Sequence, residues 1–167
     1  MSGSASNSPG KRFESRFRDS LSRFGTPIRL FDGGRFYNVY TLADYLFFRD
    51  GVPYFFECKA TRQRNPYTSE SIGIESRLAG QLKRMREFRT EQPEVRTFLA
   101  LQFYCEPLRE FESVYVLDSE DVRAASMDGL KSINRQKAAR LGVECPKVGG
   151  RYDLTGVFER WGSTRKS

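Results

Sequence analysis

The apolar pattern predicts a first helix over residues 11–24. Four apolar side chains in this stretch are separated by four, four and three residues, which places them on one face of an amphipathic helix. These side chains are Phe13, Phe17, Leu21 and Phe24. Gly25 follows directly and is typical of the end of a helix.

Two further segments have helical patterns. Residues 74–88 repeat the same spacing of apolar side chains. Residues 133–141 carry a shorter apolar stripe, with Ser132 before it as an N-terminal cap and Gly142 after it as a stop signal. A short helical turn is expected over residues 122–125.

The remaining pattern indicates six strands, over residues 27–31, 36–40, 45–48, 53–59, 96–103 and 113–117. Asp-Gly-Gly at 32–34 predicts a hairpin between the first two strands, and Asp-Gly at 50–51 predicts one between the next two. The polar, basic stretch 62–71 contains a proline and is expected to be a loop. This order of elements predicts an α/β fold rather than a helical bundle or a β-sandwich.

The length of 167 residues suits a single folded domain. Small polar residues at 1–10 and the final residues 162–167 are expected to be disordered tails around a domain over residues 11–161. The first residues lack the apolar segment of a signal peptide, and no apolar stretch approaches the length of a membrane span. A soluble, cytoplasmic protein without membrane contacts is therefore expected.

Charge and composition narrow the chemistry. Lysine and arginine number 28 against 21 acidic residues, a net charge of +7, and the chain contains no histidine. The missing histidine excludes hydrolases with a histidine base and zinc sites that need histidine ligands. Three widely separated cysteines are typical neither of a disulfide framework nor of a zinc site. Hydrolytic chemistry would have to use carboxylates, lysine, tyrosine, cysteine or a metal with oxygen ligands.

Candidate catalytic residues surround the second predicted hairpin. Asp44 precedes its first strand, and Glu57 and Lys59 lie two residues apart on its second strand, so both point to one face. Asp44 and Glu57 are hard oxygen ligands suited to Mg²⁺ or Mn²⁺, and the backbone carbonyl of Cys58 can add a third oxygen. Lys59 can orient an attacking water or neutralise a phosphate oxygen. The alternative is a solvated Glu–Lys pair on an exposed strand.

Basic side chains accompany these residues in the sequence. Residues 62–89 contain seven basic side chains against three acidic ones, and the first predicted helix adds five more. Positive charge beside carboxylates suits a polyanion such as DNA, contacted mainly through its phosphates, although a solvated charged surface is the alternative. Arg64 and Tyr67 can also stack on or brace unpaired bases. The candidate DNA-contacting residues are Arg12, Arg16, Arg62, Arg64, Tyr67, Arg77, Lys83 and Arg84.

Three blocks of sequence carry a family resemblance. ADYLFFRDGVPYFFECKAT contains an aspartate, a hairpin and a Glu-x-Lys motif, and SIGIESRLAGQLKRMREF follows as a helix. LKSINRQKAARLGVECP and GGRYDLTGVF complete the series. In this order the blocks resemble the PD-(D/E)XK nuclease superfamily, and more specifically its RecU-type Holliday junction resolvases. The resemblance extends from Lys11 to about Trp161.

The resemblance implies a fold and a site. The fold would be a mixed central β-sheet flanked by helices, the restriction-endonuclease-like core. Asp44 and Glu57 would bind the metal, Lys59 would be catalytic, and Gln81 would belong to the site from the following helix. For Gln81, an ordinary glutamine at the boundary of the core is the alternative. Glu14 occupies the place of a first-helix glutamate that completes the metal site in many relatives, whereas its spacing leaves open whether it faces or flanks the core.

The implied function is a Mg²⁺-dependent endonuclease that resolves four-way DNA junctions by paired symmetric nicks in recombination and repair. A homodimer would supply two opposed sites for a symmetric junction, and branch-migration or recombination proteins are expected partners. The interval between Pro27 and Asp44 is shorter than the stalk-bearing segment of this family. Two alternatives stay open: another nuclease of the superfamily that acts on flaps, ends or duplexes, and a non-catalytic DNA-binding protein on the same fold.

Overall fold

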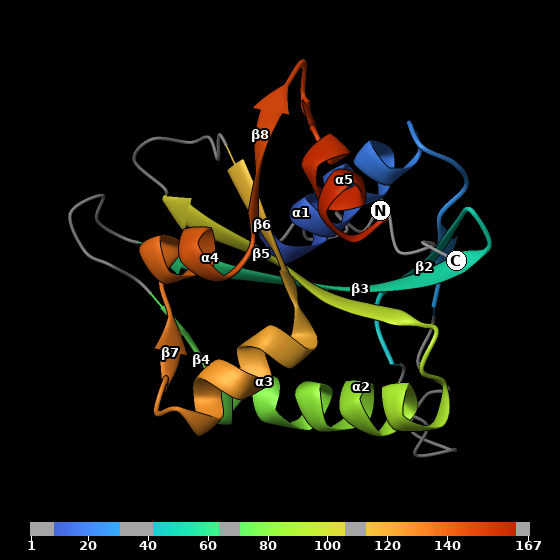
Figure 1. Ribbon diagram of the computed structural model, residues 1–167. Helices are drawn as coiled ribbons and strands as arrows, with labels where there is room; N and C mark the ends of the chain where they lie inside the picture. Colours follow the sequence, from blue (N-terminus) through green and yellow to red (C-terminus); the bar gives the residue numbers. More distant parts are fainter. Residues whose placement is uncertain (1–8, 31–41, 64–70, 106–112, 163–167) are drawn as a thin grey trace, which may run out of the picture.

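A mixed β-sheet forms the centre of the molecule (Figure 1). The computed structural model describes residues 9–30, 42–63, 71–105 and 113–162. Within these ranges seven strands form one sheet in the order β1-β2-β3-β5-β6-β8-β9. β3 and β5 run parallel, and the other neighbouring strands run antiparallel. The strands are β1 (Ile28–Arg29), β2 (Tyr45–Arg49), β3 (Val52–Gln63), β5 (Arg96–Cys105), β6 (Ser113–Asp118), β8 (Val143–Val148) and β9 (Arg151–Tyr152).

Helices cover both faces of this sheet, which confirms the predicted α/β class (Figure 1). α1 and α5 pack on one face, and α2 and α3 pack on the other. A two-stranded ribbon of β4 (Ile72–Gly73) and β7 (Ser132–Ile133) lies beside them. Of the helices in the described ranges, none is long and apolar enough to cross a membrane. The helices are α1 (Pro9–Leu21), the π-helical turn η1 (Ile74–Leu78), α2 (Ala79–Glu91), α3 (Ser119–Met127), α4 (Arg135–Leu141) and α5 (Thr155–Trp161).

Aromatic side chains dominate the core under α1 and α5. Phe13 and Phe17 of α1 are almost completely buried, and the Phe17 ring lies 5.3 Å from the ring of Phe56 on β3. The Phe56 ring in turn lies 5.4 Å from that of Phe98 on β5. Cys58 is buried in the same core. Since side chains alternate along a strand, the intervening residues of β3 face α2.

Mainly aliphatic side chains fill the core on the α2 side. Leu78 of η1 and Leu82 and Met85 of α2 are buried together with Phe55 of β3 and Leu99 of β5. The sheet is therefore covered on both faces, and β3 lies between two hydrophobic layers. A charged side chain on this strand has to be accommodated inside the protein.

The first helix and the first strand differ from their predicted positions. α1 begins at Pro9, two residues before the predicted start of the domain, and ends at Leu21. Proline suits the first turn, where its missing N–H would have no helical partner. β1 pairs with β2, with Ile28 opposite Leu46, a pairing that was not predicted. The strand predicted over residues 36–40 lies outside the described residues.

Two predicted boundaries in the middle of the chain are shifted. β3 extends to Gln63, into the predicted loop, because its pairing with β5 continues to Gln63 opposite Cys105. The predicted helix over residues 74–88 is divided between η1 and α2, and α2 continues to Glu91. The chain thus changes its helical geometry just before the turn that carries Gln81.

The C-terminal part contains elements without a predicted counterpart. Ser132 pairs with Gly73 between β7 and β4 and does not cap a helix. The cap of α4 is Asn134, whose side chain accepts the N–H of Lys137 at 2.9 Å. β8, β9 and α5 are absent from the predicted elements, and α3 is longer than the predicted turn at 122–125.

Gly142 lets the turn between α4 and β8 lie directly against β6. A Cβ at this position would lie 2.3 Å from the carbonyl oxygen of Val116, a backbone atom that cannot swing aside. Gly142→Ala is therefore expected to lower the free energy of unfolding by about 1–3 kcal/mol, the usual cost of overpacking. Urea unfolding measures this change.

Gly80→Ala is the matched control for this substitution. The added Cβ would lie 3.4 Å from Nη1 of Arg84, the end of a flexible side chain. Higher helix propensity should raise the stability by up to about 1 kcal/mol. Similar effects of the two substitutions would contradict the close-approach explanation.

Candidate active site

Asp44 lies where β2 begins, at the edge of β3. Its backbone N–H donates to the carbonyl of Phe56 at 3.0 Å, and its Oδ2 accepts the N–H of Cys58 at 2.8 Å. The pairing of β2 with β3 begins at Tyr45, opposite Phe56. The Asp44 carboxylate extends it by one further hydrogen bond, to the N–H of Cys58. Because the N–H and C=O of one strand residue point to the same edge, the Cys58 carbonyl also points to the Asp44 side.

Glu57 and Lys59 project from β3 on the side opposite to the α1 core. Lys59 Nζ lies 2.7 Å from Glu57 Oε1. The Glu57 side chain is 9% exposed and the Lys59 side chain 29% exposed. The pair is therefore largely withdrawn from water, unlike the solvated ion pair of an exposed strand.

The carboxylates of this site have raised pKa values. Burial is the main reason that the pKa of Glu57 rises from 4.5 to about 7, and the nearby charge of Asp44 adds to the rise. Burial also raises the pKa of Asp44, against the hydrogen bond from Cys58. Neighbouring carboxylates with raised pKa values are typical of functional sites, where a bound cation or substrate offsets the cost of the charges.

Arg29 and Tyr45 connect α1 to Asp44. Arg29 Nη1 lies 2.8 Å from Glu14 Oε2, 3.0 Å from the Tyr45 hydroxyl and 3.9 Å from Asp44 Oδ1. The Tyr45 hydroxyl donates to the backbone carbonyl of Glu14 at 3.3 Å. Burial acts to lower the pKa of Arg29, but the hydrogen bond to Glu14 and the surrounding charges raise it overall. The Glu14 side chain is 27% exposed and flanks the buried stripe of α1.

Gln81 is buried in the first turn of α2 and contacts the chain just before Asp44. Its Nε2 donates to the carbonyl of Leu42, and its Oε1 accepts from Arg84 Nη2 at 2.6 Å. The contacts described for this side chain support the segment that carries Asp44. They do not reach the carboxylates or Lys59.

The donor set suits a hard divalent cation such as Mg²⁺. One oxygen of each carboxylate is held by a protein donor: Glu14 Oε2 by Arg29, Asp44 Oδ2 by Cys58, and Glu57 Oε1 by Lys59. A carboxylate has two oxygens and can bind a cation through the other one. Among the described residues no group of three acidic or cysteine side chains forms a ready metal site. The candidate core of the site is a smaller set, which consists of two carboxylates and one backbone carbonyl: Asp44, Glu57 and Cys58. Glu14 lies beside them.

Two predicted DNA-contacting residues lie on α1. Arg12 and Arg16 are exposed. At 100° per residue they lie on the opposite flank of the buried stripe from Glu14. Lys11 and Arg18 share the Glu14 flank, so they are better placed for a polyanion beside that carboxylate. The positions of Lys11 and Arg18 relative to Glu14 could have been read from the helical spacing in the sequence.

The other predicted contacts are distributed over β3 and α2. Arg77 Nη2 donates to the Ala60 carbonyl at 3.2 Å, on the same edge of β3 as Asp44. Arg84 is half-buried and bonds to Gln81. The structure does not describe three predicted contacts: Arg64, Tyr67 and the side chain of Arg62.

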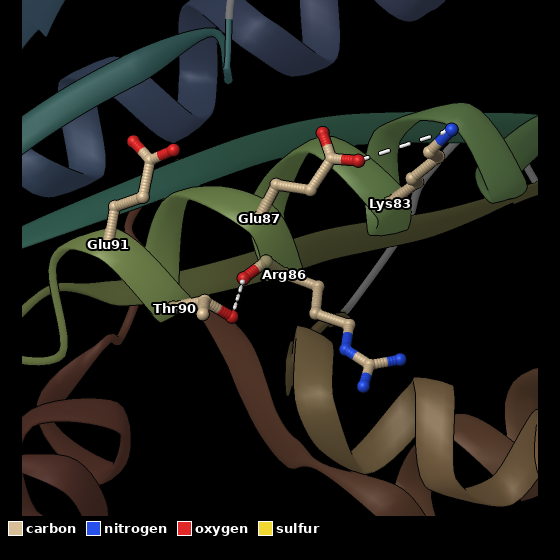
Figure 2. Close-up of a pocket in the computed structure, with 5 residues that line it drawn as sticks. All are labelled: Lys83, Arg86, Glu87, Thr90 and Glu91. Atoms are coloured by element: carbon tan, nitrogen blue, oxygen red, sulfur yellow. Dashed lines mark hydrogen bonds and ion pairs between the residues drawn. The ribbon is translucent and has the colours of Figure 1, made fainter.

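A hollow on the outer side of α2 is lined by side chains of both charges (Figure 2). Lys83 pairs with Glu87 along the helix at 4.0 Å. Figure 2 shows Glu91 on the same side of α2 as Lys83 and Glu87, whereas the Arg86 side chain extends to the other side of the helix. This balance of charge does not favour a polyanion, so the surroundings of Lys83 add no support to its predicted DNA contact.

Arg29 and Tyr45 are site residues that the sequence pattern did not reveal. The only partner predicted for residues 27–31 was the segment 36–40, so no contact between Arg29 and Asp44 was expected. The available signal was the single charge of Arg29 between two apolar residues in a predicted strand. Its meaning depends on the pairing of β1 with β2, which brings Arg29 opposite Tyr45.

Comparisons with known proteins give no family for this chain. Neither the models of known protein families nor the curated proteins match it. The motif resemblance to PD-(D/E)XK nucleases therefore stays a prediction. The chemistry of the site has to be inferred from Asp44, Glu57, Lys59 and their surroundings.

Glu57→Gln should change the pH dependence of stability in metal-free protein. With its pKa raised from 4.5 to about 7, Glu57 binds its proton more tightly in the folded state than in the unfolded state, so stability falls as the pH rises through this range. Between pH 5 and pH 8 the wild type should lose about 2–3 kcal/mol that Glu57→Gln does not lose. Urea unfolding with a chelator at both pH values measures the difference.

Asp153→Asn provides the control for this experiment. Hydrogen bonds from Thr155 lower the pKa of the exposed Asp153 carboxyl, so the group stays ionised throughout pH 5–8. This variant should keep the wild-type difference between the two pH values. A Glu57→Gln variant with the same pH dependence as the wild type would show that Glu57 is not protonated in the native protein near neutral pH.

Proposed function

We propose that this chain is a divalent-metal-dependent DNA endonuclease with a PD-(D/E)XK core, which resolves four-way junctions as a homodimer. The observation that carries the proposal is the arrangement at the edge of β3. Asp44 Oδ2 accepts the N–H of Cys58, and one residue to either side of Cys58 the buried Glu57 and the partly exposed Lys59 form an ion pair. A carboxylate pair next to a lysine suits phosphodiester hydrolysis without histidine.

The residues that would hold the cation are Asp44, Glu57 and the Cys58 carbonyl, with Glu14 as a further ligand from α1. When bound, a divalent cation supplies Lewis-acid stabilisation of phosphate charge and activates water. The oxygen donors and the raised pKa values of Asp44 and Glu57 support this assignment. Mg²⁺ is the expected ion, and Mn²⁺ has the same ligand preference.

Lys59 supplies a positive charge beside the candidate metal ligands. It contacts Glu57 at 2.7 Å, and its partial exposure lets it reach a bound phosphate. There it can neutralise a phosphate oxygen or orient the attacking water. Gln81 supports the Asp44 segment through the Leu42 carbonyl, so we assign it a positioning role and not direct contact with the reacting atoms.

Cleavage of a synthetic four-way junction tests the substrate. With Mg²⁺ the protein should introduce two symmetric nicks, and a chelator should abolish them. Matched linear duplex and flap substrates should be cut more slowly. Equal or faster cleavage of duplex or flap DNA would favour another nuclease activity of the same superfamily, and binding without cleavage would favour a non-catalytic DNA-binding protein.

Asp44→Asn tests the residue assignment. The variant keeps a side-chain oxygen for the N–H of Cys58 but removes the charge. Cleavage should fall by at least ~100-fold, since loss of even an outer partner of a metal ligand costs up to that factor. Junction binding, measured by gel shift in Ca²⁺ or chelator, should be retained, because the variant removes a negative charge near DNA phosphates.

Asp50→Asn is the control in the same hairpin. Asp50 is exposed at the turn between β2 and β3 with φ 51°, a conformation that asparagine tolerates well. This variant should cleave at the wild-type rate. Undiminished Mg²⁺-dependent cleavage by Asp44→Asn would refute the assignment of the site.

A further inference from the structure

One nitrogen of Arg29 joins three elements at the edge of the candidate site. Nη1 donates to Glu14 Oε2 of α1 at 2.8 Å and to the Tyr45 hydroxyl of β2 at 3.0 Å. The same atom lies 3.9 Å from Asp44 Oδ1. Arg29 is therefore a charged bridge between the carboxylate on α1 and the carboxylate next to β3.

The backbone fixes this bridge in place. β1 pairs with β2 so that Arg29 lies opposite Tyr45, and Leu30 N–H donates to the Asp44 carbonyl at 2.9 Å. Tyr45 adds a second contact to α1 through the backbone carbonyl of Glu14. The Arg29 guanidinium also lies over the Tyr45 ring, 5.1 Å from its centroid. Strand pairing thus fixes the backbone of Arg29, and contacts with Glu14 and Tyr45 fix its guanidinium group.

The contacts of Arg29 leave carboxylate oxygens open for a cation in the site. Arg29 bonds to Oε2 of Glu14, and a carboxylate can bind a second cation through its other oxygen. Its separation of 3.9 Å from Asp44 Oδ1 exceeds a hydrogen bond, so the charge is near without binding that oxygen directly. Carboxylate ligands held by an outer hydrogen-bond partner are common at metal sites, where the partner orients the ligand.

We propose that Arg29 is a positioning residue that holds Glu14 beside Asp44 and Glu57, so that the divalent-cation affinity of the site depends on the contact between α1 and β1. This inference rests on the proposed metal-dependent function. Arg29 acts through Glu14 and does not itself touch the cation.

The test measures Mn²⁺ binding by the full chain without DNA, by calorimetry or electron paramagnetic resonance. Arg29→Met should weaken Mn²⁺ binding by about tenfold, within the usual range for an outer partner of a metal ligand. Glu14→Gln should weaken it similarly, and the double variant should show little further loss, because both changes remove the same contact. Arg29→Lys should be intermediate, since a lysine supplies charge without the planar guanidinium.

Arg49→Met is the matched control from β2. Arg49 lies over the rings of Phe24 and Phe158, at 5.2 Å and 4.6 Å from their centroids, outside the carboxylate contacts described above. Its Mn²⁺ affinity should equal that of the wild type. Saturating Mn²⁺ should restore junction cleavage by Arg29→Met toward the wild-type rate, which a general loss of folding would not allow.

The outcomes separate this inference from the proposed function. Wild-type Mn²⁺ binding that Arg29→Met leaves unchanged or strengthens would overturn the positioning role and make Arg29 a competitor of the cation. Additive losses in Glu14→Gln and Arg29→Met would also overturn it, because the residues would then act independently. Absence of Mn²⁺ binding by the wild type would overturn both this inference and the metal-dependent function.

Discussion

The alternation of side chains along β3 is the constraint on which the rest of the structure depends. Phe56 and Cys58 enter the core under α1, whereas Glu57 and Lys59 point to the other side. Pairing with β5 fixes this register along the strand, with Glu57 opposite Leu99. A shift by one residue would exchange aromatic and charged positions, so the core and the candidate site specify each other. Glu57 is buried because its strand is central.

The same burial requires the carboxylates to have partners. An isolated ionised carboxylate is costly inside a protein, and hydrogen bonds or opposite charges have to offset that cost. Here each of three carboxylates has a different donor: Arg29 for Glu14, a backbone N–H for Asp44, and Lys59 for Glu57. These donors offset only part of the cost of burying the charges, as the raised pKa values of Asp44 and Glu57 indicate, so a bound cation could offset the rest. Charge balance and candidate chemistry therefore depend on the same side chains.

Local periodicity was sufficient to predict the parts of the site that lie on one hairpin. Asp44, Glu57 and Lys59 follow from a turn signal and a period of two, and the buried face of α1 follows from a helical period. The Arg29 contact depends instead on the pairing of β1 with β2, which spans a long interval of sequence, while the Asp-Gly-Gly signal suggested a local partner. Patterns in the sequence of one short strand contain little information about a partner strand this far along the chain.

The unpredicted C-terminal elements have similarly physical causes. β8 has mostly exposed or half-buried side chains and contains Pro146, which normally argues against a strand. α5 is as short as α4, with seven residues, and no side chain caps its N-terminus. Both elements gain their place from packing: Cys145 of β8 and Phe158 of α5 are buried in the core under α1. Tertiary contacts thus override weak local preferences here.

The position of Cys58 makes its thiol a probe for the detachment of α1 from the sheet. It belongs to the same strand as the candidate ligands, but its side chain is buried under α1, and this burial raises the pKa of the thiol well above its ordinary value. A thiol in this state reacts slowly while the helix stays docked. Detachment of α1 would uncover Cys58 and at the same time carry Glu14 away from Asp44. When reclosing is faster than the reaction, the rate of chemical modification of this thiol would therefore report how much of the native protein has α1 detached and Glu14 separated from Asp44.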